Sequence, residues 1–298
     1  MNSFISSSDT VAHRTFIRVF AMVLAVGLVV LIGGGEIIIR TRDTPPTDDM
    51  AEYRRLFYEQ AAPIVAFGDS HVARGLPRSD KTLLNLGWPS DNLHTVMDKL
   101  KLRQQTLPAR LVIVQADPHQ FSNYRLLARQ EERGAALRSS FQPPLKILEN
   151  AHRQYLFQYW YSVTVGFFIE PVQLGPKEIA RQVLIRVQLH TPMSSFAGTP
   201  LLADYRDLLR SLVSQGVKVC LVRFPVSKAY RELADTITPF RNAETVLKNM
   251  ALDNGWAFAD YWDKASDVFF HPEDPDHLNP AGAEWLRERV LRDCDWHE

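Results

Sequence analysis

The sequence predicts an α/β domain with a parallel sheet, preceded by one transmembrane helix. Two observations predict this fold class. Short apolar runs alternate with helical patterns along most of the chain, which is the rhythm of a parallel sheet covered by helices on both faces. An unbroken apolar run from Val19 to Gly35, extended beyond Glu36 by residues 37–39, has the length needed to span a bilayer.

The composition is that of an ordinary folded protein. The chain has 298 residues, 34 basic and 34 acidic side chains, 46% apolar residues and a pI near 7.1. This balance excludes a disordered or nucleic-acid-coating protein, so we expect no nucleic-acid partner. Cys220 and Cys294 lack the spacing of a zinc site or a redox pair, and we expect both to be structural. The sequence leaves open whether they pair with each other.

The apolar N-terminal run is expected to be an uncleaved anchor. Its length exceeds that of a signal-peptide core, and it ends in Gly-Gly-Gly-Glu rather than at a small-x-small cleavage site. We therefore expect residues 1–18 in the cytoplasm and residues 19–39 in the inner membrane. Arginines lie on both sides of the run, so charge does not decide the orientation. The chemistry expected of the domain favours the periplasmic or extracellular side.

The folded domain is expected at residues 51–298, after an exposed, proline-containing linker at residues 40–50. A helix is expected at residues 91–105. The predicted strands cover residues 62–67, 82–87, 109–116, 217–224 and 255–260. Between residues 121 and 199 the rhythm fails, which indicates an insertion.

The insertion contains residues 155–169, an uncharged and aromatic stretch that is short for a membrane span. Two interpretations remain open. The stretch is either a core or capping helix, or an aromatic surface that rests on the bilayer or on a membrane partner.

A candidate nucleophile follows the first predicted strand, where Gly68-Asp69-Ser70 stands. Functional residues of parallel sheets gather at the carboxyl ends of the strands. A serine attacks efficiently only when a histidine takes its proton and a carboxylate orients that histidine. The competing interpretation is that Ser70 only caps a helix.

The required histidine and acid occur near the C-terminus as Asp274-Pro-Asp-His277. We expect a stiff, proline-held loop in which Asp274 binds one imidazole nitrogen of His277 while the other faces Ser70. Asp276 is the competing orienter. His271 lies nearby without a cysteine or carboxylate at ligand spacing, so we expect no metal site.

These motifs resemble the SGNH (GDSL-type) hydrolase superfamily over residues 62–292. The resemblance rests on Gly68-Asp69-Ser70, on Asn85-Leu-Gly87 after the second strand, and on Asp274-x-x-His277-Leu-Asn before the last helix. It implies a flavodoxin-like three-layer α/β/α domain without a cofactor. Ser70 would be the nucleophile, His277 the general base and Asp274 its orienter. The backbone N–H groups of Ser70 and Gly87 would stabilise the oxyanion.

One departure concerns the third block, where the superfamily carries Gly-x-Asn-Asp and this chain has Gln115-Ala-Asp117-Pro-His119. An ionised aspartate cannot donate a hydrogen bond. Either Gln115 or His119 substitutes as the oxyanion donor, or the chemistry is not fast hydrolysis, which we favour. We expect Asp117 and His119 to line the pocket. We expect His71 to orient substrate or support the fold, with direct catalysis as the alternative.

The GDSH form, the missing asparagine, the anchor and the stretch at residues 222–230 together resemble the membrane-anchored acyltransferase branch, which includes DltD-like and alginate-acetylation proteins. This implies an extracytoplasmic serine O-acyltransferase or esterase that modifies an envelope or secreted polysaccharide through an acyl-Ser70 intermediate. A multispanning membrane O-acyltransferase would be its partner. The alternatives are a general lipase or esterase and a catalytically silent adaptor. Arg74 and Arg223 could receive an anionic substrate group.

Overall fold

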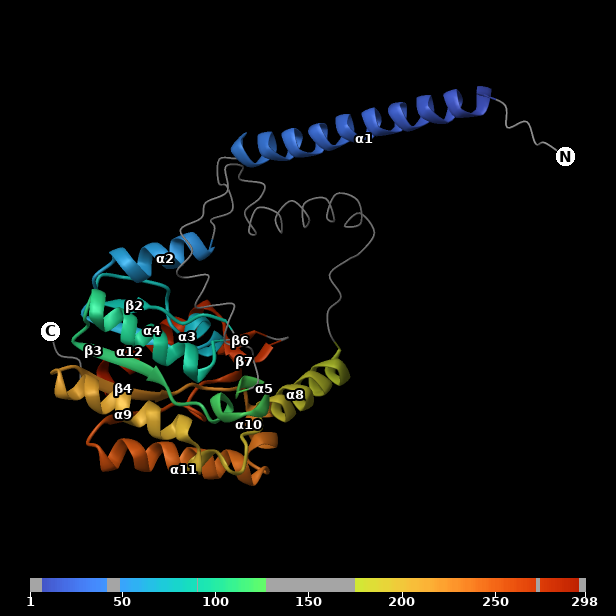
Figure 1. Ribbon diagram of the computed structural model, residues 1–298. Coiled ribbons are helices and arrows are strands. Elements are labelled where there is room, and N and C mark those ends of the chain that lie inside the picture. The colour runs from blue at the N-terminus through green and yellow to red at the C-terminus, as the bar shows by residue number, and fades with distance from the viewer. Residues whose placement is uncertain (1–6, 42–48, 90, 127–174, 272–273, 295–298) are drawn as a thin grey trace. The chain divides into compact units, whose positions relative to one another are not determined.

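The computed structural model describes residues 7–41, 49–89, 91–126, 175–271 and 274–294 (Figure 1). The chain forms two compact units. One is the N-terminal helix α1, Ser7–Thr41, and the other is a compact domain that begins at Tyr53. The predicted aromatic stretch at residues 155–169 lies outside the described residues.

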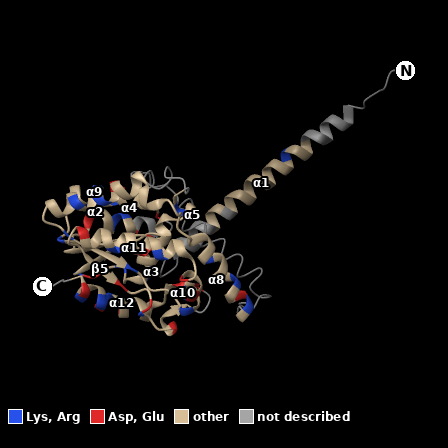
Figure 2. Cartoon of the chain, turned by 90° about the horizontal axis from the view of Figure 1, so that it is seen from below, with Lys and Arg blue, Asp and Glu red and all other residues tan. Residues whose placement is uncertain are grey.

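Helix α1 contains a segment, Thr15–Gly34, that is long and apolar enough to cross a membrane. In Figure 2 the coloured part of this helix is tan apart from one blue band, and Arg18 is the charged residue within the segment. Its large apolar side chains between Phe16 and Val30 are exposed. A signal sequence has the same properties, so the helix is present as predicted and its role as a retained anchor stays a prediction.

The domain is built on five parallel strands, as predicted. In chain order they are β1 Ile64–Phe67, β2 Leu83–Asn85, β3 Leu111–Gln115, β4 Lys218–Arg223 and β5 Ala257–Asp260. The spatial order is β2-β1-β3-β4-β5, which is the flavodoxin-like order. Each strand lies within its predicted range and is shorter by one or more residues at its ends.

Helices cover both faces of the sheet, which gives the three-layer α/β/α fold (Figure 1). Helices α3 and α12 lie on one face, whereas α9 packs on β4 and α11 on β5. The longer helices of the domain are α2 Asp49–Glu59, α4 Leu93–Thr106, α8 Pro176–His190, α9 Pro200–Ser214, α11 Thr238–Asp253 and α12 Pro280–Asp293. The shorter ones are α3 Ser70–Gly75, α5 Asn123–Leu126 and α10 Lys228–Ala234, with 3₁₀ turns η1 Pro118–Phe121, η3 Phe196–Gly198 and η4 Asp267–Phe269.

Alternate residues of each central strand face opposite helical layers. Ile64 and Ala66 of β1, together with Leu111 and Ile113 of β3, belong to the buried cluster beneath α3 and α12. The residues between them are also fully buried. Strands covered on both faces need apolar side chains on both faces, which explains the continuous apolar runs in the sequence.

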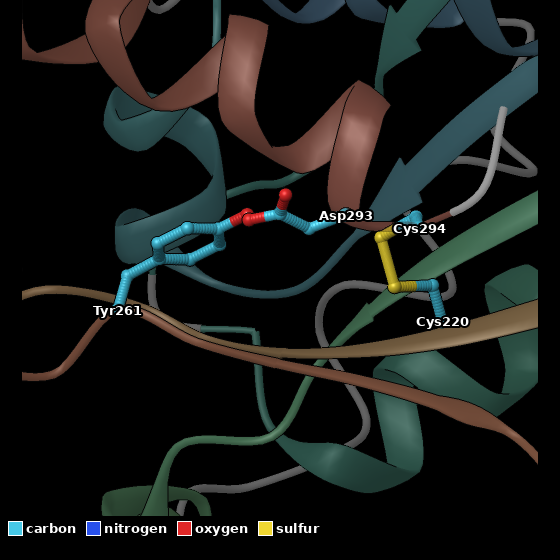
Figure 3. The surroundings of a disulfide bond; sticks show 4 residues. All are labelled: Cys220, Tyr261, Asp293 and Cys294. Atoms are coloured by element: carbon cyan, nitrogen blue, oxygen red, sulfur yellow. A yellow bond between two sulfur atoms is a disulfide. The ribbon is translucent and has the colours of Figure 1, made fainter.

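A disulfide joins Cys220 of β4 to Cys294, the residue after α12 (Figure 3). Beside it, the Tyr261 hydroxyl donates to Asp293 Oδ2 at 2.8 Å. The two cysteines, whose pairing the sequence left open, therefore link the last helix to the sheet. Among the described residues no cysteine is free.

The segment that carries Asp274 and His277 is a strand, and the prediction of a proline-held loop is wrong. Strand β7, Asp274–Leu278, pairs antiparallel with the short strand β6, Phe270–His271. A proline fits because a two-stranded ribbon has only edge strands, where no second neighbour needs the missing N–H group. The expected linker at residues 40–50 is also helical at both ends, since α1 runs to Thr41 and α2 begins at Asp49.

Candidate active site

Ser70 lies at the carboxyl end of β1, as the first residue of α3. The chain packs closely here, and glycine is required at position 68. A Cβ atom on Gly68 would lie 2.3 Å from the Val72 side chain. Asp69 is the N-cap, and its Oδ1 accepts from the N–H of His71 at 2.9 Å. The side chain of Ser70 is therefore not needed as the cap. It is partly exposed, and the described residues provide no hydrogen-bond partner for its hydroxyl.

A histidine–carboxylate dyad lies on β7, which packs against α3. His277 Nδ1 and Asp274 Oδ1 are 2.7 Å apart, whereas the nearer oxygen of Asp276 is 3.7 Å from the same nitrogen. Asp274 is thus the hydrogen-bond partner and Asp276 is not. The Nε2 atom of His277 is buried and has no partner among the described residues. The His277 ring lies 5.2 Å, edge on, from the ring of His71, the neighbour of Ser70.

The second oxygen of Asp274 accepts from Arg74 Nη1 at 2.6 Å. Arg74 lies one turn after Ser70, so this ion pair ties the helix of the serine to the strand of the histidine. Arg186 of α8 lies further out, 3.9 Å from Asp274. Arg223 is buried, pairs with Glu244 at 2.8 Å and is not available to substrate.

Asp69 is the centre of a buried polar network that the sequence did not indicate. Its Oδ2 accepts from Arg125 Nη2 at 2.7 Å, from Gln120 Nε2 at 2.8 Å and from His119 Nε2 at 2.7 Å. Burial alone would raise the pKa of Asp69, but His119 and the Arg125 guanidinium hold it well below its usual range. Asp69 is therefore ionised. Burial lowers the pKa of His119 more than the charge of Asp69 raises it, so His119 is a neutral donor.

Gln115 uses both of its polar atoms inside this network. Its Oε1 accepts from the N–H of Asp69 at 2.8 Å and from Gln120 at 3.0 Å, and its Nε2 donates to Asp117 Oδ2 at 2.6 Å. Gln115 and His119 would have to leave these bonds to face a substrate.

Gly87 does not present a free N–H group either, because the amide donates to Asn85 Oδ1 at 2.9 Å. The glycine is required for close packing. A Cβ atom here would lie 2.5 Å from the backbone nitrogen of Ala73 in α3.

His71 is a buried cation between two carboxylates. Its Nδ1 lies 2.8 Å from Asp117 Oδ2 and its Nε2 lies 3.5 Å from Asp276 Oδ2. Burial would lower the pKa of His71, but the hydrogen bond to Asp117 and the carboxylate of Asp276 raise it to about 10. Burial likewise raises the pKa of Asp276, while His71 and His277 lower it well below its usual range. The structure thus places a fixed imidazolium beside the serine.

Two site residues come from the region that the sequence left uninterpreted, Arg125 of α5 and His190 at the end of α8. The His190 ring stacks on His119 at 4.7 Å and its Nδ1 lies 2.9 Å from the Tyr230 hydroxyl. Burial lowers the pKa of His190 well below its usual range. No motif surrounds either residue, so sequence reasoning had no signal for them.

Two groups of these side chains have the composition of metal ligands, namely Asp69 with His71 and His119, and His71 with Asp276 and His277. In the first group Asp69 and His119 bond each other. In the second group, the Nε2 atoms of both histidines and the Asp276 oxygens have no hydrogen-bond partner among the described residues.

The fold is similar to solved esterase structures. One is an acylhydrolase from Bacteroides fragilis, with 11% identity, a TM-score of 0.44, and coverage of 84% of this chain and 97% of that one. A second is a GDSL-like lipase from Bacteroides thetaiotaomicron, with 12% identity, a TM-score of 0.42, and coverage of 82% of this chain and 96% of that one. A third is an acetylxylan esterase from Geobacillus stearothermophilus, with 10% identity, a TM-score of 0.43, and coverage of 80% of this chain and 95% of that one. No family model and no curated protein sequence matches the chain. Similarities this remote do not assign a function to the chain.

Proposed function

We propose that this protein is a serine acyltransferase or esterase with Ser70 as nucleophile, His277 as general base and Asp274 as the orienter of His277. One observation carries the proposal. His277 is held at Nδ1 by Asp274 at 2.7 Å, and its buried Nε2 has no partner in the described parts of the chain, while the neighbouring helix begins with a serine whose hydroxyl is not needed as the cap. A nucleophilic serine needs such a base, and the base needs such a carboxylate.

In the first step, Ser70 Oγ attacks the carbonyl carbon of an ester and its proton passes to His277 Nε2. The tetrahedral intermediate collapses when His277 returns that proton to the leaving alkoxide, which leaves an acyl-Ser70 ester. A hydroxyl group of the acceptor, or water, then gives its proton to His277 and attacks the same carbonyl. The bond between the acyl carbon and Ser70 Oγ breaks, and His277 returns the proton to Ser70, which releases the acylated acceptor or the free acid. Asp274 keeps the proton on Nδ1 and stabilises the imidazolium during both steps.

Oxyanion stabilisation in this proposal falls on the backbone N–H of Ser70 and on the charge of His71. Gln115, His119 and the Gly87 amide all donate within the fold. Loss of one oxyanion donor slows hydrolases by about 10²- to 10³-fold. A slow site of this kind suits an enzyme that receives one delivered acyl group better than a general hydrolase.

We place the domain outside the cytoplasm, anchored by α1 to the inner membrane beside a multispanning O-acyltransferase. The acceptor would be an envelope or secreted polysaccharide. The apolar helix near the N-terminus supports the anchor. The Cys220–Cys294 disulfide supports the compartment, because such bonds persist in oxidising environments and are rare in the cytoplasm.

A fluorophosphonate probe tests the proposed nucleophile. We expect one covalent adduct per chain on the full-length protein, at Ser70, and none on Ser70→Ala. Ser79→Ala is the matched control, since Ser79 is exposed and its hydroxyl bonds only Gln60 among the described residues. A probe adduct that persists in folded Ser70→Ala contradicts the proposal.

The acceptor separates the three candidate functions. Transfer of acetyl from an activated ester to a polysaccharide supports the acyltransferase. Release of free acetate whatever acceptor is added supports a general esterase. Full polysaccharide acetylation in cells carrying Ser70→Ala supports the silent adaptor.

A further inference from the structure

We propose that His71, Asp276 and His277 form a binding site for one transition-metal cation of the Zn²⁺ class. The three residues come from the start of α3 and from β7, and one ligand atom of each lies within 4.8 Å of the others. His71 Nε2 is 3.5 Å from Asp276 Oδ2, and Asp276 Oδ1 is 3.7 Å from His277 Nδ1, the nitrogen that also bonds Asp274. Two imidazoles and a carboxylate are a common protein ligand set for zinc.

The facing atoms of this group lack hydrogen bonds. His71 Nε2, His277 Nε2 and both carboxylate oxygens of Asp276 are buried, and none has a hydrogen-bond partner within the described parts of the chain. Buried polar atoms are normally paired, since leaving one unpaired costs about 1–3 kcal/mol. Four such atoms on three neighbouring side chains indicate that something they can bind belongs there.

The outer partners are also those of a metal site. Each imidazole is held at Nδ1 by a carboxylate, His71 by Asp117 at 2.8 Å and His277 by Asp274 at 2.7 Å. Metal-binding histidines almost always have such a partner, which fixes the ring and leaves the other nitrogen for the ion. The charge is suitable too. Asp274 and Asp276 face two guanidinium groups, those of Arg74 and Arg186, and Asp117 adds a third carboxylate beside His71.

Metal binding would draw the ligand atoms closer together. Ligand atoms of a tetrahedral zinc site lie about 3.4 Å apart, given bonds of about 2.0–2.1 Å. The 3.5 Å between His71 Nε2 and Asp276 Oδ2 is close to this value, and one ligand atom of each of the three residues lies within 4.8 Å of the others. The ion would replace the positive charge that a proton on His71 now supplies between Asp117 and Asp276.

This cation would inhibit the reaction proposed above, a consequence that rests on the proposed function. An ion bound to His277 takes the lone pair that should receive the Ser70 proton. Zinc would therefore act as a reversible inhibitor, and a chelator would restore activity.

Equilibrium dialysis with elemental analysis tests the site directly on full-length, untagged protein in detergent, after metal removal. We expect one bound Zn²⁺ per chain and no Mg²⁺, which prefers oxygen ligands. We expect Asp276→Asn and His71→Gln to weaken zinc binding at least about 10-fold, the loss caused even by removal of an outer-shell partner. His271→Gln is the control, because His271 is exposed on the adjacent strand and should leave binding unchanged.

A second measurement does not depend on the variants. Co²⁺ bound to the wild type should show the intense visible absorption of a four-coordinate site, and one equivalent of Zn²⁺ should abolish it. Absence of a stoichiometric ion in the wild type overturns the metal site, as does unchanged binding in folded Asp276→Asn. The fluorophosphonate adduct on metal-free protein reports the proposed function separately, so each proposal can fail without the other.

Discussion

Loss of the Cys220–Cys294 disulfide should lower the free energy of unfolding by about 4 kcal/mol. The two residues are 74 positions apart. For a loop of that size, the entropy that the cross-link removes from the unfolded chain corresponds to about 4 kcal/mol at room temperature. Both cysteines are buried, so Cys220→Ala with Cys294→Ala adds a small packing loss.

Urea unfolding of the full chain in detergent, followed by tryptophan fluorescence, measures this change. With a slope of about 3 kcal/mol per molar urea, the midpoint should fall by more than about 1 M. Reductant should lower the wild-type midpoint similarly and leave the double variant unchanged. A loss below about 1 kcal/mol would refute the reasoning, since the last helix would then be held by packing alone.

Three further predictions concern the site. Ser70→Ala and His277→Ala should each abolish acyl transfer by a similar large factor, and the double variant should be no worse, because residues acting as one unit are non-additive; single-turnover rates measure this. Asp69→Leu should cost about 3–5 kcal/mol by leaving Arg125 buried and unpaired. The wild type should also lose stability on acidification. An aspartate whose pKa is lower in the folded than in the unfolded state stabilises the fold above its unfolded pKa of about 3.9, and this stabilisation is lost as the pH falls through the folded pKa. In urea titrations Asp69→Leu should lack this pH-dependent part of the stability. Gly87→Ala should destabilise the domain by about 1–3 kcal/mol or prevent folding, since the added methyl meets the backbone of α3, and thermal unfolding tests this.

The sheet could be predicted because its signal is local. Each strand is a short apolar run, and burial on both faces makes that run continuous, as in Ile64–Phe67 and Leu111–Gln115. The conformation of Asp274–Leu278 was misjudged for the opposite reason. Prolines indicate a loop locally, whereas pairing with β6 is a tertiary effect that tolerates Pro275 at an edge.

The site was predictable only where its residues are neighbours in sequence. Asp274 and His277 are three positions apart, so their dyad can be inferred from spacing. Arg125 and His119 bond Asp69 from distant positions in the sequence, and Arg125 lies within the predicted insertion. No sequence spacing predicts such contacts. Asp69 is both the cap of α3 and the centre of an ionic network.

Peptide mass spectrometry of the acyl-enzyme tests the central claim most directly. Full-length protein incubated briefly with an activated acetyl ester and quenched in acid should carry one acetyl group, on the peptide that contains Ser70. The same treatment of His277→Ala should leave that peptide unmodified, because no base remains to take the serine proton. Acetylation at another residue, or equal acetylation of Ser70 in His277→Ala, would contradict the account.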